Sequence, residues 1–197
     1  SFGYNIYKWK KLKEYFDNNI FNEGQLIENY GFRIDERIIE YPWFFSRLPK
    51  DSGNLLDAGS ILNHELIVNQ PSLQSKKIFI STLGPEENCF WKRGISYVFE
   101  DLRNCCYRDN YFDWIACIST AEHIGLDNTR LYTDDISKNE NNPGSYMSAI
   151  NEFHRILKSG GILYLTLPFG KKINRGWFQV FDDKMIDELI AAFNPSS

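Results

Sequence analysis

The chain has 197 residues and a formal net charge of −4, an acidic balance that argues against a nucleic-acid binder relying on phosphate neutralisation. Hydrophobic residues make up 43% of the sequence, which is too many for a disordered protein. Length and composition therefore predict a globular protein with one main domain and a buried core.

The first 50 residues are predicted to form a helical arm rich in aromatic side chains. Apolar residues between Ile6 and Phe16 recur at helical spacing. Four lysines lie among them, at positions 8, 10, 11 and 13, and they favour a solvated helix face over a lipid or RNA contact.

A second amphipathic helix is predicted over residues 36–41. Asp35 is its candidate N-cap, and Pro42 is expected to kink or end it. The following Trp43-Phe44-Phe45 is too apolar to stay exposed, so we expect residues 1–50 to pack as a lid or extension on the main domain, residues 51–197.

From Asn54 onward, short apolar strands alternate with longer polar segments. Candidate strands are residues 54–57, 77–81, 96–99, 113–119 and 162–168. A helix is predicted over Met147–Leu157, ended by Ser159-Gly160-Gly161, and another from Asp182 or Asp183 to Phe193. This alternation predicts a three-layer α/β sandwich with a mostly parallel, Rossmann-like sheet.

The four cysteines show no CxxC pair and no zinc-ligand spacing, and Cys117 is predicted to be a buried thiol in a strand. No apolar stretch approaches the roughly 20 residues of a membrane helix, and no signal peptide opens the chain. We therefore expect a protein of the reducing cytoplasm without a membrane span.

In an open parallel sheet, ligands bind at the carboxyl ends of the strands. The candidate site residues are therefore those that directly follow each strand. They are Asp57, Gly59 and Ser60, then Thr82 and Leu83, then Glu100, Asp101 and Leu102, and finally Ser119, Thr120, Glu122 and His123.

Several of these segments, in this order, resemble class I S-adenosylmethionine-dependent methyltransferases of the methyltransferase-11 type. Residues 55–59 (LLDAG) are similar to the first motif of that family. Residues 100–102 with 111–115 resemble its acidic third-strand turn and its lead into the fourth strand. Residues 118–124 (ISTAEHI) resemble the segment after that strand, and 153–161 (FHRILKSGG) the approach to the fifth, with serine in place of proline.

The resemblance implies methyl transfer from S-adenosylmethionine to oxygen or nitrogen of a small-molecule or glycan-type acceptor. It implies cofactor binding by Asp57, Gly59, Ser60, Thr82, Asp101, Leu102 and Ser119, with Asp101 and Leu102 at the adenine. It also makes His123 and Glu122 the candidate catalytic residues, with no metal.

Each role has a structural alternative. Asp57 could cap the following turn, Asp101 could orient its loop through Arg103, and His123 could be a structural histidine beneath the site. A Glu122–His123 pair could in principle bind a metal. His154 is predicted to be a core or boundary residue on the apolar face of its helix.

The chain also departs from the family pattern. The later glycines of the first motif are missing, so the backbone is expected to approach the ligand differently, and Asn63 is a residue that could tolerate a left-handed conformation there. The second strand ends without an acid, which leaves Ser81 or Thr82 for the ribose. No closing hairpin follows residue 193, from which we expect a truncated carboxyl end.

These departures favour an alternative function, a catalytically degenerate methyltransferase-like module that binds or scaffolds. A nicotinamide-dependent enzyme is disfavoured because the dinucleotide glycine fingerprint is absent from the sequence.

Overall fold

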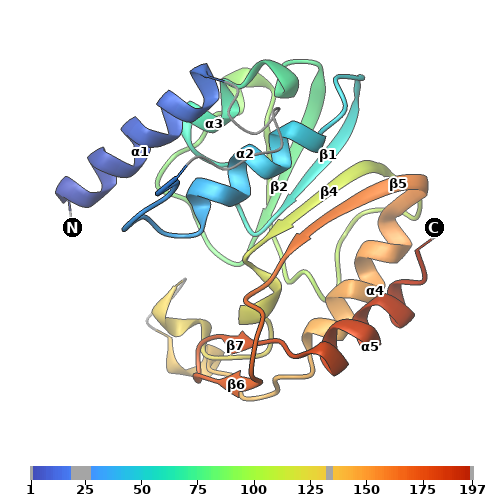
Figure 1. The fold of residues 1–197 in the computed structure, drawn as a ribbon. Helices are drawn as coiled ribbons and strands as arrows, with labels where there is room; N and C mark the ends of the chain where they lie inside the picture. Colours follow the sequence, from blue (N-terminus) through green and yellow to red (C-terminus); the bar gives the residue numbers. More distant parts are fainter. Residues whose placement is uncertain (1, 19–27, 132–134, 196–197) are drawn as a thin grey trace. The chain divides into compact units, whose positions relative to one another are not determined.

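The computed structural model describes residues 2–18, 28–131 and 135–195 (Figure 1). As far as they are described, these residues form two compact units. The first takes in residues 1–51 and 65–75, and the second takes in residues 52–64 and 76–197. Within the described ranges, no helix combines the length and the apolar character needed to cross a membrane.

The first unit is helical. It contains α1 (Phe2–Asp17), α2 (Arg37–Arg47), the short α3 (Glu65–Val68) and a 3-10 turn, η2 (Pro71–Leu73). Three of the four lysines of α1 pair with acids of this unit: Lys8 with Asp35 at 2.9 Å, Lys11 with Glu14 at 2.6 Å and Lys13 with Asp17 at 2.7 Å. Asp35 thus pairs with Lys8, and α2 has no side-chain cap, so the predicted N-cap is wrong.

Helix α2 runs through Pro42 and does not end there, so of the two expected effects only a kink stays a prediction. Proline has no N–H to donate to the carbonyl four residues earlier, that of Ile38. The hydroxyl of Tyr30 donates to that carbonyl instead, at 2.8 Å. A side chain outside the helix therefore replaces the missing backbone donor.

The second unit is built on a five-stranded parallel sheet. Its strands are β1 (Gly53–Ala58), β2 (Lys76–Thr82), β3 (Ser96–Phe99), β4 (Phe112–Ile118) and β5 (Leu157–Thr166), in the order β3-β2-β1-β4-β5. The central strand β1 and its neighbour β4 are almost entirely buried, as parallel strands covered on both faces are. The predicted Rossmann-like α/β class is confirmed.

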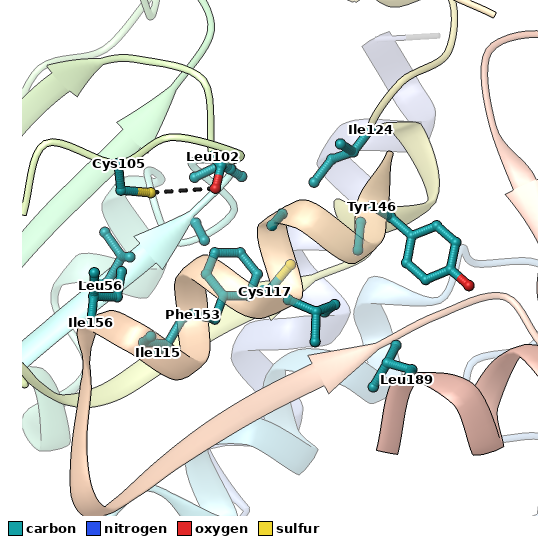
Figure 2. Close-up of a cluster of buried hydrophobic side chains, with 14 of the residues drawn as sticks. Leu56, Leu102, Cys105, Ile115, Cys117, Ile124, Tyr146, Phe153, Ile156 and Leu189 are labelled. Atoms are coloured by element: carbon teal, nitrogen blue, oxygen red, sulfur yellow. Dashed lines mark hydrogen bonds between the residues drawn. The ribbon is translucent and has the colours of Figure 1, made fainter. Parts of the chain in front are cut away.

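Helices α4 (Tyr146–Ile156) and α5 (Asp183–Phe193) lie side by side along the sheet (Figure 1). Their apolar faces enclose a core with the strands, and Figure 2 shows Ile115 and Cys117 in one cluster with Phe153 and Leu189. Cys117 is fully buried, as predicted. The Asp182 carboxylate accepts from the Met185 amide at 3.0 Å, which confirms the predicted start of α5.

Two predictions near α4 are wrong. Residues 159–161 do not end the helix, because β5 begins directly after it at Leu157 and these residues form a bulge between the Phe112–Leu157 and Trp114–Ile162 pairs. His154 is exposed, and its ring meets Phe193 edge-on at 5.6 Å.

A small antiparallel hairpin, β6 (Ile173–Asn174) and β7 (Gln179–Val180), was not predicted. It joins β5 to α5 (Figure 1). Each of its strands pairs over only two residues, too short for an alternating hydrophobic pattern to be visible in the sequence.

Candidate functional site

The strand order reverses at the centre of the sheet, because β1 pairs with β2 on one side and with β4 on the other. Such a reversal leaves a crevice at the carboxyl ends of the strands. A hollow of about 440 Å³, part of it open to solvent, lies there. Seven of the predicted site residues line this hollow: Gly59, Thr82, Leu83, Asp101, Leu102, Thr120 and His123.

The carboxylate of Asp57 organises the turn after β1. Asp57 is fully buried, and its two oxygens accept from the backbone amides of Ile61 at 3.1 Å and Leu62 at 2.8 Å. Asp57 does not itself line the hollow. These bonds are those of the capping alternative, and a contact with a cofactor stays a prediction.

The backbone of this turn passes close to the segment after β4. Gly59 has φ of +113°, and a Cβ there would lie 2.2 Å from the hydroxyl oxygen of Thr120. Ser60 follows with φ of +63°. The left-handed residues of this turn are thus Gly59 and Ser60 and not Asn63, whose side-chain oxygen accepts from the Tyr97 hydroxyl at 2.8 Å.

At the end of β2, neighbouring hydroxyls have different surroundings. Ser81 donates to Glu100 at 2.7 Å and shares a 2.9 Å hydrogen bond with the Tyr107 hydroxyl. Thr82 is 2% exposed and lines the hollow, and its hydroxyl oxygen has no hydrogen-bond partner within the described part of the chain. A buried polar atom without a partner is costly, and a bound ligand is a common reason for one.

After β3, one arginine bridges two carboxylates at the wall of the hollow. Arg103 binds Asp101 through Nε at 3.0 Å and through Nη2 at 2.5 Å, and binds Glu140 through both terminal nitrogens at 2.6 Å. Burial favours the neutral acid, but the hydrogen bonds from Arg103 outweigh it and lower the pKa of Asp101. The bonds to Asp101 and Glu140 raise the pKa of Arg103.

Asp101 is therefore held by Arg103, as its structural alternative proposed, and it also lines the hollow. Leu102 lines the hollow too, and it belongs to the core cluster in Figure 2, where its carbonyl accepts from the Cys105 thiol at 3.4 Å. The wall near the predicted adenine position is thereby tied to the packed core.

After β4, the ring of His123 is oriented by a residue far away in the sequence. Its Nδ1 lies 2.7 Å from the carbonyl oxygen of Trp177, and the Trp177 ring stacks on it at 5.3 Å between centroids. A carbonyl only accepts, so Nδ1 carries a hydrogen and, in the neutral ring, Nε2 carries the lone pair. This nitrogen lies 4.0 Å from an oxygen of buried Glu122.

Ser119, which directly follows β4, does not line the hollow. Its φ is +42°, and its amide donates to the Thr166 hydroxyl at 3.0 Å. Within the described ranges, no group of three or more His, Cys, Asp or Glu side chains is arranged to hold a metal ion.

No protein-family model matches the chain, and no curated protein matches it by sequence. Solved structures do match. Geranyl diphosphate C-methyltransferase from Streptomyces coelicolor, in complex with Mg²⁺, geranyl diphosphate and S-adenosyl-L-homocysteine, superposes with a TM-score of 0.56 at 10% identity, over 78% of this chain and 58% of that one. The chain has the class I methyltransferase fold.

Further structures agree on this fold. The PH0226 protein of Pyrococcus horikoshii has a TM-score of 0.52 at 15% identity, over 84% of this chain and 86% of that one. A Haemonchus contortus phosphoethanolamine N-methyltransferase was solved with phosphomonomethylethanolamine and S-adenosylhomocysteine. It has a TM-score of 0.51 at 13% identity, over 79% of this chain and 36% of that one. This chain thus spans less than two thirds of either named methyltransferase.

Three residues of this methyltransferase-fold site were missed by sequence reasoning: Arg103 as a bridge, Glu140 and Trp177. Glu140 lies in a polar loop that carries no recognisable pattern, and it meets Arg103 across 37 positions. Trp177 meets His123 across 54 positions. Only the aromatic pair Trp177-Phe178 within a polar segment could have drawn attention to that stretch.

Proposed function

We propose that this chain binds S-adenosylmethionine in the hollow at the ends of β1 to β4 and transfers its methyl group to a small-molecule acceptor. The observation that carries the proposal is the Thr82 hydroxyl, buried and unpartnered within the described residues, at the switch point of a methyltransferase fold. Two proteins with this fold were solved with the demethylated cofactor.

The residues around the hollow fit this cofactor. Thr82 replaces the missing acid after β2 as hydrogen-bond partner for a ribose hydroxyl, while Ser81 is occupied by Glu100 and Tyr107. Gly59 has no side chain of its own, so its backbone packs against the Thr120 side chain and leaves room for the methionine part to approach. Asp101 and Leu102 form the wall assigned to adenine.

His123 is the group that prepares the acceptor. The cofactor supplies an electrophilic sulfonium methyl, and an oxygen or nitrogen acceptor must lose a proton as it attacks. With Nδ1 held by the Trp177 carbonyl, Nε2 of His123 is the nitrogen that takes this proton. A sugar hydroxyl of a glycan-type acceptor, or an amine, suits such a base.

A second candidate is a degenerate module of the same fold that binds without catalysing. It is favoured by the absence of an acid at the end of β2 and by the engagement of Asp57 with the turn amides and of Asp101 with Arg103. Absence of cofactor binding would exclude the first candidate, because a chain without bound cofactor has no methyl group to transfer.

Thr82→Val tests the proposed site, because it keeps the shape of the side chain and removes its hydroxyl. We expect calorimetric titration with S-adenosylhomocysteine to show affinity weakened by about fivefold to tenfold, the value of one hydrogen bond. Urea unfolding of the cofactor-free variant should show stability that is unchanged or higher by up to about 1 kcal/mol, since an unpartnered buried hydroxyl is removed.

Ser46→Ala is the control, because it removes a hydroxyl that bonds the Trp43 carbonyl and the Arg47 guanidinium within α2 and does not line the hollow. It should leave cofactor affinity unchanged. Equal affinity in Thr82→Val and wild type would show that Thr82 is misassigned. A folded wild-type protein that gives no heat at millimolar cofactor would contradict methyl transfer and favour the degenerate module.

A further inference from the structure

The β6–β7 hairpin is a concentrated basic segment in an acidic chain. Between Phe169 and Phe181 the sequence contains Lys171, Lys172 and Arg175 and no aspartate or glutamate. The whole chain, in contrast, has a formal net charge of −4. All three cations are exposed. No ion pair found within the described ranges includes any of them.

This hairpin is attached to the segment that carries His123. Besides the stacked ring and the Nδ1 contact, the carbonyl of Gly176 accepts from the amide of Asp127 at 2.9 Å. The turn itself is ordered by a 2.8 Å bond from the Arg175 amide to the Phe178 carbonyl and by a 2.7 Å bond from the Gly176 amide to Asn174. The three cations therefore lie on a defined element next to the predicted base.

The same turn also offers apolar surface. Trp177 and Phe178 pack edge to face at 4.8 Å between centroids, and both are only partly buried. A guanidinium and two ammonium groups bind oxyanions through charge-assisted hydrogen bonds, and the guanidinium matches the two oxygens of a phosphate or carboxylate. Cations with an aromatic pair suit a ligand that has both an anionic group and an apolar or ring-shaped part.

We infer that the β6–β7 hairpin binds the phosphate or carboxylate group of an anionic acceptor and so positions its nucleophile at His123. This inference rests on the proposed methyl transfer and narrows its acceptor to an anionic small molecule. The remainder of the protein, net negative, repels such a ligand, so a local positive patch beside the site both steers and orients it.

The test uses simple oxyanions as probes. The ¹⁵N-labelled full chain is titrated with inorganic pyrophosphate, with malonate and with glucose, in the absence and in the presence of saturating S-adenosylhomocysteine. We expect saturable shifts of the amides of residues 170–178 and of the Trp177 indole with one or both anions, and none with glucose. Shifts with pyrophosphate alone would indicate a phosphorylated acceptor, and shifts with malonate alone would indicate a carboxylated acceptor.

The hairpin variant replaces all three cations by glutamine (Lys171→Gln, Lys172→Gln, Arg175→Gln). It should weaken anion binding at least tenfold and keep S-adenosylhomocysteine affinity within twofold of the wild-type value. The matched control, Lys10→Gln, Lys50→Gln, Lys77→Gln, removes three exposed lysines elsewhere, and it should keep anion affinity within twofold. Circular dichroism confirms that both variants fold.

The inference is overturned if neither anion shifts these amides, or if the control variant loses as much affinity as the hairpin variant. Failure of the proposed function looks different. In that case S-adenosylhomocysteine does not bind, while pyrophosphate or malonate still shifts the hairpin amides. This result would support an oxyanion site on the hairpin and contradict methyl transfer.

Discussion

Ser60 shows how one residue sets the conformation of the turn after β1. Its φ of +63° lies in the left-handed region, which costs an L-residue about 1–2 kcal/mol and costs glycine far less. The turn holds this conformation because Asp57 accepts from two amides immediately beyond it. The buried carboxylate thus compensates for a residue that is locally unfavourable.

Ser60→Gly is therefore expected to raise the free energy of unfolding by roughly 0.5–1 kcal/mol, since relief of the strained φ exceeds the added entropy of glycine in the unfolded chain. Urea unfolding measures this change. Ser52→Gly, at an exposed residue without positive φ, should lower stability slightly. A loss of stability in Ser60→Gly would mean that the turn does not strain its backbone.

At the scale of an element, α2 shows how a helix tolerates an internal proline. Pro42 leaves the carbonyl of Ile38 without its usual backbone donor, and the Tyr30 hydroxyl, contributed by another segment of the first unit, satisfies it. The sequence shows that a proline interrupts the helical pattern. It does not show that a side chain outside the helix supplies the missing donor.

Tyr30→Phe should lower the free energy of unfolding by about 1–2 kcal/mol, because a partly buried carbonyl is left unsatisfied. In a Pro42→Ala background, where residue 42 regains its N–H, the same change should cost clearly less, and a double-mutant cycle measures the difference. Tyr7→Phe, at a tyrosine on α1 that is 44% exposed, should have little effect. Equal costs in both backgrounds would contradict this account.

At the scale of the whole molecule, ion pairs tie segments of the second unit together. Arg155 of α4 binds Glu152 at 2.7 Å and also the carbonyls of Tyr107 and Cys105, while Glu152 accepts from the Cys105 amide at 3.0 Å. The hydrogen bonds from Arg155 lower the pKa of Glu152, against the opposing effect of burial. The loop after β3, which contributes to the hollow, is thereby attached to the helix layer.

A carboxyl whose pKa is lower in the folded state stabilises the protein fully above its unfolded pKa, and this contribution is lost as the pH falls through the folded pKa. Unfolding free energy should therefore fall as the pH drops below about 4.5, the ordinary value for glutamate. Glu152→Gln should cost roughly 1–2 kcal/mol at pH 7 and make this acid dependence shallower, as measured by urea unfolding from pH 7 to pH 3.

Glu188→Gln is the matched control for the pH series, because Glu188 is 54% exposed and its lysine partner lies 3.7 Å away. Its stability and acid dependence should follow those of the wild type. An unchanged acid slope in Glu152→Gln would show that other groups govern acid unfolding.

The sequence by itself determined the parallel sheet and which residues follow its strands, because apolar runs and crossover rules are local or topological properties. Gly59, Thr82, Asp101, Leu102 and His123 were found in this way at one hollow. Only the tertiary structure decided their surroundings. These are the Arg103–Glu140 pairing, the different hydrogen bonding of the Ser81 and Thr82 hydroxyls, and the contact of Trp177 with His123. These depend on side chains tens of positions apart, and no local periodicity encodes which partners the packed chain brings together.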